Sequence, residues 1–328
     1  MAAEGTRRPR HDGNGANQHT TGAKTLVTLV RSRGLLVWAA TLWVVLIWGT
    51  GWLFIKVGVT YLPPLTLAGS RFTAAGGVLC AIALLTRRPL PSRRGDWLFL
   101  ASAGLLFAGL ASGLNFWGQQ FITSGLAAVV WSAMPLVTAL LAHWTLPQEP
   151  LTPSRALGIA VGFGGVVLAS AGGLSIAQLP DLRGVASIFL SAVVWAIALI
   201  WTRRRGTRLD PLVVSGVQAF FGGLPLLLVG LALEWGHPIP VTPLTVLDFL
   251  YLTLVVSTLT QTVYLWLLQQ VGATRVSYIS LVVPVIAVII GAVALHEDFG
   301  WHMVGGALGV GAGALLINVP VKRVGGKA

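Results

Sequence analysis

The chain has 328 residues, of which 55% are apolar and only 10% are charged, and its mean hydropathy is +0.80. This composition excludes a water-soluble domain and predicts an integral membrane protein. The net charge of +12 is spread between apolar segments and does not form one basic face, so we expect no nucleic-acid partner. A single cysteine, Cys80, excludes an intrachain disulfide and a cysteine-based metal site.

Ten apolar stretches follow a polar N-terminal segment. About 20 apolar residues are needed to cross a hydrocarbon core of about 30 Å. The ten predicted spans are residues 36–58, 64–86, 97–119, 123–146, 154–172, 183–202, 211–233, 246–268, 272–294 and 301–319. Residues 1–33 are expected to form a disordered tail, and residues 320–328 form a short second tail. The predicted fold class is therefore an all-α polytopic membrane protein.

The second half of the chain repeats the first at an offset of about 147 to 149 residues, beginning with Trp48 against Trp195. We therefore predict two five-helix repeats, residues 36–172 and residues 183–319. Because five is an odd number, the second repeat must insert upside down relative to the first. Inverted repeats of this kind are the basis of alternating access in many transporters.

The distribution of charge predicts the orientation, because cytoplasmic loops collect Lys and Arg. With the N-terminus inside the cell, all 22 Lys and Arg except Lys56, Arg71 and Arg183 fall on the cytoplasmic side. The acidic residues expected on the external side are Asp181, Glu234, Asp248, Glu297 and Asp298. We predict a multi-pass protein of the inner membrane with both termini in the cytoplasm.

Aromatic and polar residues at depth in the spans are candidates for substrate contact. An unpaired polar group in hydrocarbon costs several kcal/mol, so such a group usually faces protein or a water-filled space. The candidate substrate-binding residues are Trp48, Arg71, Asn115, Trp131, Trp195, Gln218, Gln261, Tyr264 and Tyr278. For each Trp, ordinary packing is the alternative. Arg71 either binds a substrate carboxylate or closes an external gate, or else it links structurally to backbone carbonyls; Lys56 is expected to snorkel to the interface.

Prolines and glycines predict the shape of the helices. Pro135 and Pro284 each remove a backbone donor and kink a helix, and the freed carbonyls either line a cavity or merely accompany a bend. Small residues four positions apart let helices approach closely. The predicted packing glycines are Gly158, Gly162, Gly305, Gly309 and Gly313. Ordinary helix packing and a homodimer interface are both open readings of these glycines.

The acidic residues also constrain the mechanism. None lies deep in a predicted span, which favours facilitated export, or coupling through another group, over a carboxylate-based antiport. A neutral or zwitterionic metabolite fits Trp, Asn, Gln and a lone Arg better than an organic cation does. The external cluster of His296, Glu297, Asp298 and His302 is interpreted as a solvated connection, so we expect no metal and no cofactor.

Four segments carry a resemblance to a known family. They are "WGTGWLFIK" from Trp48 to Lys56, "PPLTLAGSRF" with Arg71, and the two Glu-plus-glycine segments that begin at Glu149 and Glu297. Over residues 38–318 the chain resembles the ten-span EamA-type exporters of the drug/metabolite transporter superfamily. The two halves differ, because Ala196 follows Trp195 where a Gly follows Trp48, and Gln218 stands where Arg71 stands.

The resemblance implies a transporter that exports amino acids or related small metabolites, and not an enzyme. A nucleotide-sugar or other organic-anion transporter is the alternative among transporters. A polytopic membrane enzyme acting on lipids is the alternative from another class.

Overall fold

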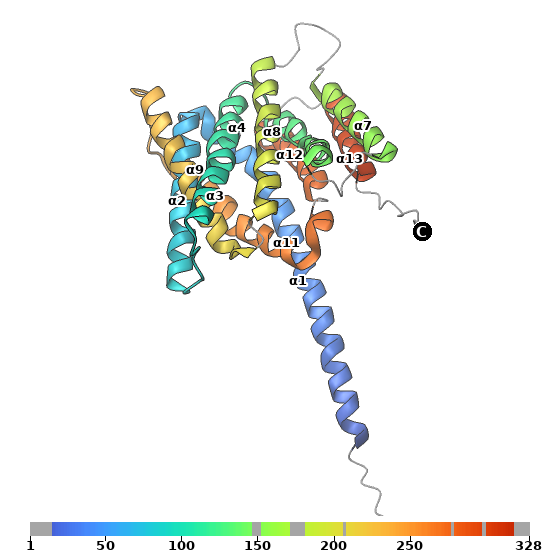
Figure 1. Ribbon diagram of the computed structural model, residues 1–328. Coiled ribbons are helices and arrows are strands. Elements are labelled where there is room, and N and C mark those ends of the chain that lie inside the picture. The colour runs from blue at the N-terminus through green and yellow to red at the C-terminus, as the bar shows by residue number, and fades with distance from the viewer. Residues whose placement is uncertain are drawn as a thin grey trace, which may run out of the picture. The chain divides into compact units, whose positions relative to one another are not determined.

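The computed structural model of the chain describes residues 15–145, 152–170, 181–205, 208–276, 279–296 and 300–317. Within these ranges the regular elements are all helices (Figure 1). The first half contains α1 (Gly15–Tyr61), α2 (Pro64–Leu85), α3 (Arg94–Gly104), the π-helix η1 (Leu105–Ala111), α4 (Ser112–Gln119), α5 (Ser124–Trp131), α6 (Met134–Thr145) and α7 (Pro153–Ser170). The second half contains α8 (Leu182–Arg205), α9 (Pro211–Leu233), α10 (Pro243–Leu250), the π-helix η4 (Tyr251–Thr260), α11 (Gln261–Val276), α12 (Ile279–Leu295) and α13 (Trp301–Ile317).

Seven helical stretches in the described residues are long and apolar enough to cross a membrane. They are Gly34–Tyr61, Pro64–Leu85, Arg94–Gln119, Ser124–Thr145, Leu182–Thr202, Pro211–Leu233 and Pro243–Leu267. Three further apolar helices are shorter, namely Pro153–Ala169, Val282–Leu295 and Trp301–Leu316. The all-helical membrane fold is confirmed, whereas the count of ten spans in two inverted repeats stays a prediction.

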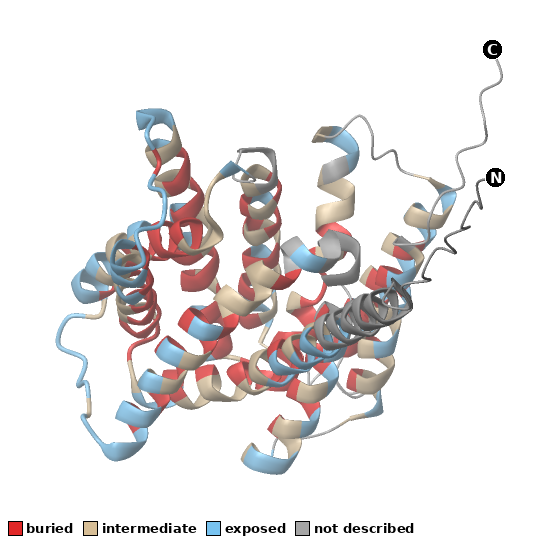
Figure 2. Cartoon of the chain, turned by 90° about the horizontal axis from the view of Figure 1, so that it is seen from below, coloured by how far each residue is buried: buried red, intermediate tan, exposed pale blue. Residues whose placement is uncertain are grey.

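The outer surface of residues 41–328 agrees with a membrane environment. Large apolar side chains are exposed on several helices, including Leu85 of α2 at 83% and Val293 of α12 at 73%. Buried residues instead gather where the helices face one another (Figure 2). Lipid tails are as apolar as these side chains, so such an outer face needs no further protein cover.

Several helix boundaries differ from the prediction, among them those of α1 and α11. The chain divides into two compact units, residues 1–40 and 41–328, and in the first of them α1 already begins at Gly15, inside the segment that was expected to be disordered. An existing helix extends more easily than a new one nucleates, which accounts for this continuation. Similarly, α11 runs to Val276, through the predicted connection at residues 269–271.

Helices α2 and α9 are packed backbone to backbone (Figure 1). A Cβ atom on Gly76 would lie 2.3 Å from the backbone N of Phe220, and one on Gly223 would lie 2.5 Å from the backbone N of Thr73. These distances are too short for any side chain. Glycine is therefore the residue that allows this antiparallel pair to approach so closely.

Charged side chains connect α2 and α9 at both ends of the pair. At one end the Glu234 carboxylate accepts hydrogen bonds from the backbone N of Leu65 at 2.9 Å and of Thr66 at 2.8 Å. These N–H groups belong to the first turn of α2, where helical partners are missing and negative charge is stabilising. At the other end Arg88 lies 3.6 Å from Asp210. Glu234 thus joins two helices, whereas we had expected it only as a residue of an external loop.

Helices α7 and α13 form a second close pair (Figure 1). A Cβ atom on Gly313 would lie 2.4 Å from the carbonyl O of Gly158 and 2.6 Å from the N of Gly162. One on Gly309 would lie 2.9 Å from the Cα of Gly165. Gly305 is less tightly packed, since its nearest neighbour, a Leu168 side-chain carbon, is 3.1 Å away. The glycine strips thus join two helices within one chain, and a homodimer stays an untested prediction.

Candidate functional site

Two π-helices occupy corresponding places in the two halves. Leu105 opens η1, and Leu252, which is 147 residues later, lies at the start of η4. At each π-helix a hydroxyl side chain donates a hydrogen bond to the carbonyl five residues earlier. Ser112 Oγ donates to the carbonyl of Phe107 at 3.1 Å, and Thr258 Oγ1 donates to that of Thr253 at 2.8 Å. Single π-helical turns occur frequently at functional sites. Both of these π-helices contribute to the same cavity.

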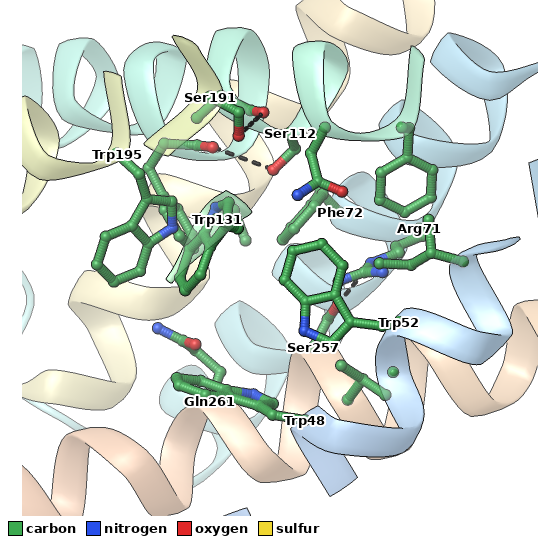
Figure 3. A pocket seen from close by; sticks show the side chains of 18 of the residues that line it. Trp48, Trp52, Arg71, Phe72, Ser112, Trp131, Ser191, Trp195, Ser257 and Gln261 are labelled. Atoms are coloured by element: carbon green, nitrogen blue, oxygen red, sulfur yellow. Dashed lines mark hydrogen bonds between the residues drawn. The ribbon is translucent and has the colours of Figure 1, made fainter. Parts of the chain in front are cut away.

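This cavity has a volume of about 140 Å³, and Figure 3 shows the side chains that line it. Its walls come from both halves of the chain and combine aromatic rings with a small number of hydroxyl and amide groups. The predicted substrate-binding residues that line it are Trp48, Arg71, Asn115, Trp131, Trp195 and Gln261. The structure therefore brings six of the predicted residues together around one space.

The remaining predicted residues lie elsewhere. Gln218 is 8% exposed, and its Nε2 donates to Thr202 Oγ1 at 3.2 Å. Tyr264 does not line the cavity but packs against Trp48, with the ring centroids 4.7 Å apart. Tyr278 lies outside the described residues.

The two prolines predicted to kink helices occupy different positions in their helices. Pro135 is the second residue of α6, after a break that separates this helix from α5 at Ser132 and Ala133. Pro284 lies inside α12, which continues on both sides of it. Trp131, just before the break, and Val283, just before Pro284, both line the cavity.

A chain of aromatic rings forms one wall. Trp52 contacts Trp131 at 5.8 Å between ring centroids, Trp131 contacts Trp195 at 5.6 Å, and Trp195 contacts Phe107 at 5.5 Å. All three contacts are edge-to-face, which is a favoured geometry for aromatic pairs. Trp52 and Phe107 were not predicted as site residues, although Trp52 lies one helical turn from Trp48 and that spacing is visible in the sequence.

Arg71 supplies a positive charge to this aromatic cavity. It is 6% exposed, and its Nε donates to Ser257 Oγ at 2.9 Å (Figure 3). Its guanidinium carbon lies 4.6 Å from the ring centroid of Phe72 and 5.1 Å from that of Phe116. Its Nη1 has no hydrogen-bond partner among the described residues. A guanidinium that is fixed by one hydrogen bond and keeps an unpaired N–H donor can bind a carboxylate.

The Nζ of Lys56 donates to the carbonyl of Gln119 at 2.8 Å and to that of Ile122 at 2.9 Å. Gln119 ends α4 and Ile122 follows it, and a positive charge is favourable at a helix C-terminus, where carbonyls lack helical partners. Lys56 therefore ties α1 to the connection between α4 and α5. That Lys56 snorkels to the interface stays a prediction.

Asp248 is an acidic residue that the structure buries inside a span. It lies in α10, within the candidate span Pro243–Leu267, and it is only 2% exposed. The helix starts three residues before the predicted span because Thr242 caps it and accepts a hydrogen bond from the backbone N of Thr245 at 3.2 Å. Asp248 is thus buried near the start of its span, and the assignment of that end to the external side stays a prediction.

The predicted external cluster is only partly described. His296 has a positive φ of 52° and is exposed at the end of α12, and His302 lies at the start of α13. Glu297 and Asp298 lie outside the described residues. Within the described ranges no group of three or more His, Cys, Asp or Glu side chains is arranged to hold a metal ion.

The described residues are helical, have an apolar outer face and surround a cavity of aromatic and polar side chains, which is the arrangement of multi-pass membrane proteins that handle small solutes. A model described as the EamA-like transporter family matches the chain twice, over residues 35–171 and 182–319. The chain belongs to this family and is a membrane transporter.

Similar proteins from bacteria carry corresponding names. The chain is 31% identical to "Uncharacterized inner membrane transporter YedA" of Escherichia coli (strain K12) over 255 residues, which are 75% of this chain and 78% of that protein. It is 27% identical to "Uncharacterized transporter YvbV" of Bacillus subtilis (strain 168), over 85% of this chain and 90% of that protein. A solved crystal structure with 20% sequence identity matches at a TM-score of 0.60, over 85% of this chain and 94% of that one, and thus has the same fold.

Proposed function

We propose that this transporter exports small neutral or zwitterionic metabolites, such as amino acids, by alternating access through the central cavity. The observation that carries the proposal is Arg71, whose buried guanidinium keeps one nitrogen unpaired inside an aromatic cavity. A substrate carboxylate would pair with this guanidinium. The indole rings and the side chains of Asn115 and Gln261 would contact the rest of the substrate.

The arrangement of the halves supports alternating access between two inverted repeats. Trp48 and Trp195, which are equivalent in the repeat, face the same cavity, and η1 and η4 are equivalent elements that both line it. A site at the interface of two repeats is where rocking of one half against the other would open it to either side. In this proposal both termini are cytoplasmic, as the distribution of Lys and Arg predicts.

The cavity size favours a small substrate. Its volume of about 140 Å³ is close to that of an engineered cavity of about 150 Å³ that accommodates benzene. A nucleotide sugar is several times larger, and its phosphates would require several cations. Among the described residues that line the cavity, Arg71 is the one charged side chain. These observations favour a metabolite of amino-acid size over the organic-anion alternative.

Metabolite profiling tests the proposal. The medium and the contents of cells overproducing the protein would be compared with those of cells making Arg71→Gln at matched membrane abundance. Arg183→Gln is the matched control, because this arginine is exposed and pairs with Asp181. We expect a few small metabolites to accumulate outside with the wild type and the control, and not with Arg71→Gln. Unchanged external pools together with altered membrane lipids would contradict transport and favour a membrane enzyme.

A further inference from the structure

Asp248 is a buried carboxyl group that the described protein leaves without partners. It is 2% exposed, and neither of its oxygens accepts a hydrogen bond from the described residues. An ionised carboxylate in such surroundings is strongly destabilised, whereas a protonated carboxyl group avoids most of that penalty. The protonation state of Asp248 can therefore respond to a change in the charges around it.

Asp248 lies next to the substrate cavity without lining it. A Cβ atom on Gly58 would lie 2.7 Å from Asp248 Oδ2 and 2.6 Å from a side-chain carbon of Leu67, so α1, α2 and α10 meet at this point. Ile55 precedes Gly58 by one turn and Arg71 follows Leu67 by one turn, and both line the cavity. The carboxyl group is thus about one helical turn away from the wall that carries Arg71.

Arg71 is the charged group that acts electrostatically on Asp248 within the described part of the chain. Two ionisable groups on neighbouring elements have hydrogen-bond partners of their own. From α1, Lys56 is bound to carbonyls at the end of α4. From η4, the Tyr251 hydroxyl is hydrogen-bonded to Thr50 Oγ1 at 2.5 Å. Arg71 has a free Nη1 on one side and the unbonded Asp248 carboxyl nearby, so it can neutralise Asp248 or a ligand in the cavity.

We propose that Asp248 takes up a proton when a substrate carboxylate binds Arg71, so that substrate and proton cross the membrane in the same direction. With the cavity empty, the positive charge of Arg71 stabilises an ionised Asp248. A bound substrate carboxylate neutralises Arg71 and adds a second negative charge, which favours the protonated form of Asp248. By linkage, protonation of Asp248 in turn strengthens substrate binding. This inference rests on the proposed function in two respects: the substrate carries a carboxylate, and its own outward gradient exceeds the inward proton gradient, so that export carries a proton out with each substrate.

Proton binding can be measured without knowing the substrate. Infrared difference spectra of the reconstituted protein would be recorded as a function of pH, and the carbonyl-stretch band of a protonated carboxyl group would be followed. The other carboxyl groups of the chain also contribute to this band, so each variant would be compared with the wild type. We expect one titrating component of the wild-type band to be lost in Asp248→Asn and retained in Asp248→Glu. Asp96→Asn, a carboxyl change in the first turn of α3 and away from the cavity, should leave that component unchanged. Identical pH-dependent bands in the wild type and Asp248→Asn would overturn the inference.

Coupling is then measured in liposomes with an isotope-labelled mixture of the standard L-amino acids as the probe. Uptake into liposomes whose exterior is one pH unit more acidic should reach an accumulation ratio of up to about tenfold for one coupled proton. In Asp248→Asn the accumulation ratio should no longer follow the pH gradient, while Asp96→Asn should behave as the wild type does.

Exchange of labelled for unlabelled probe at equal pH separates the two proposals. Exchange in the wild type without any response to the pH gradient would overturn the coupling and leave the proposed function intact. Absence of exchange would contradict the amino-acid substrate, and the infrared titration would still decide whether Asp248 binds a proton.

Discussion

Gly76 and Gly77 are adjacent in α2, yet their surroundings predict opposite effects of the same substitution. A Cβ atom on Gly76 would lie 2.3 Å from the backbone N of Phe220 and 2.7 Å from its Cα, whereas one on Gly77 meets nothing within 4 Å. Backbone atoms of α9 cannot move away by a change of rotamer, so Gly76→Ala must separate α2 from α9. Overpacking of this kind costs about 1–3 kcal/mol. Gly77→Ala should instead stabilise the helix by about 0.5–1 kcal/mol.

The two variants would be compared by thermal unfolding of the detergent-solubilised protein, as the fraction that remains monodisperse after heating. One kcal/mol corresponds to a shift of about 2–4 °C in a domain of about 150–250 residues, and to less in a longer chain. We therefore expect Gly76→Ala to lose a few degrees and Gly77→Ala to lose none. Equal stability of the two variants would refute the backbone contact between α2 and α9 on which this reasoning depends.

Three further substitutions test the contacts that position the site. Glu234→Gln removes the negative charge at the start of α2 and should lower the free energy of unfolding by about 1 kcal/mol, whereas Asp181→Asn, at an exposed ion pair, should have no measurable effect in the same thermal assay. Lys56→Met leaves the carbonyls at the end of α4 without their cation and should cost about 1 kcal/mol; a melting curve identical to that of the wild type would contradict this role. Trp195→Ala removes two edge-to-face contacts and should weaken apparent substrate affinity about tenfold in transport assays. Trp235→Ala, which changes an 85% exposed residue, should not alter affinity, and equal affinities in these two variants would argue against the aromatic wall.

The positions of the helices could be predicted because each membrane crossing requires a long apolar run. Pro64 and Pro211, each at the first position of its helix, also mark where α2 and α9 begin. The two stretches of π-helix could not be predicted, since they depend on packing between helices and on hydroxyl groups that bond to carbonyls five residues earlier. The glycine contacts of the α2–α9 pair were missed for a related reason: the spacing is visible in the sequence, but the partner helix is not.

The candidate site was predicted where the repeat and the depth in the membrane agreed, as for Trp48 and Trp195. The prediction failed for single residues whose side-chain direction depends on local hydrogen bonds. Gln218 occupies the position equivalent to Arg71, yet its amide bonds to Thr202. The burial of Asp248 was not predicted, because an acidic residue near the end of a span usually lies in water. Thr242 followed by Pro243 was the available signal, since a Thr cap with Pro at the first helical position indicates an earlier helix start.

The central claim is that the cavity becomes accessible from both sides of the membrane, and cysteine accessibility tests this claim most directly. The chain has one cysteine, so Cys80→Ala gives a background without reactive thiols. Ala219→Cys would place a thiol at the cavity, and Ala127→Cys, at a fully buried position away from it, serves as the control. Alternating access predicts that a membrane-impermeant thiol reagent labels Ala219→Cys in both right-side-out and inside-out vesicles and leaves Ala127→Cys unlabelled. Labelling of Ala219→Cys from neither side, or from the same single side under all substrate conditions, would contradict it.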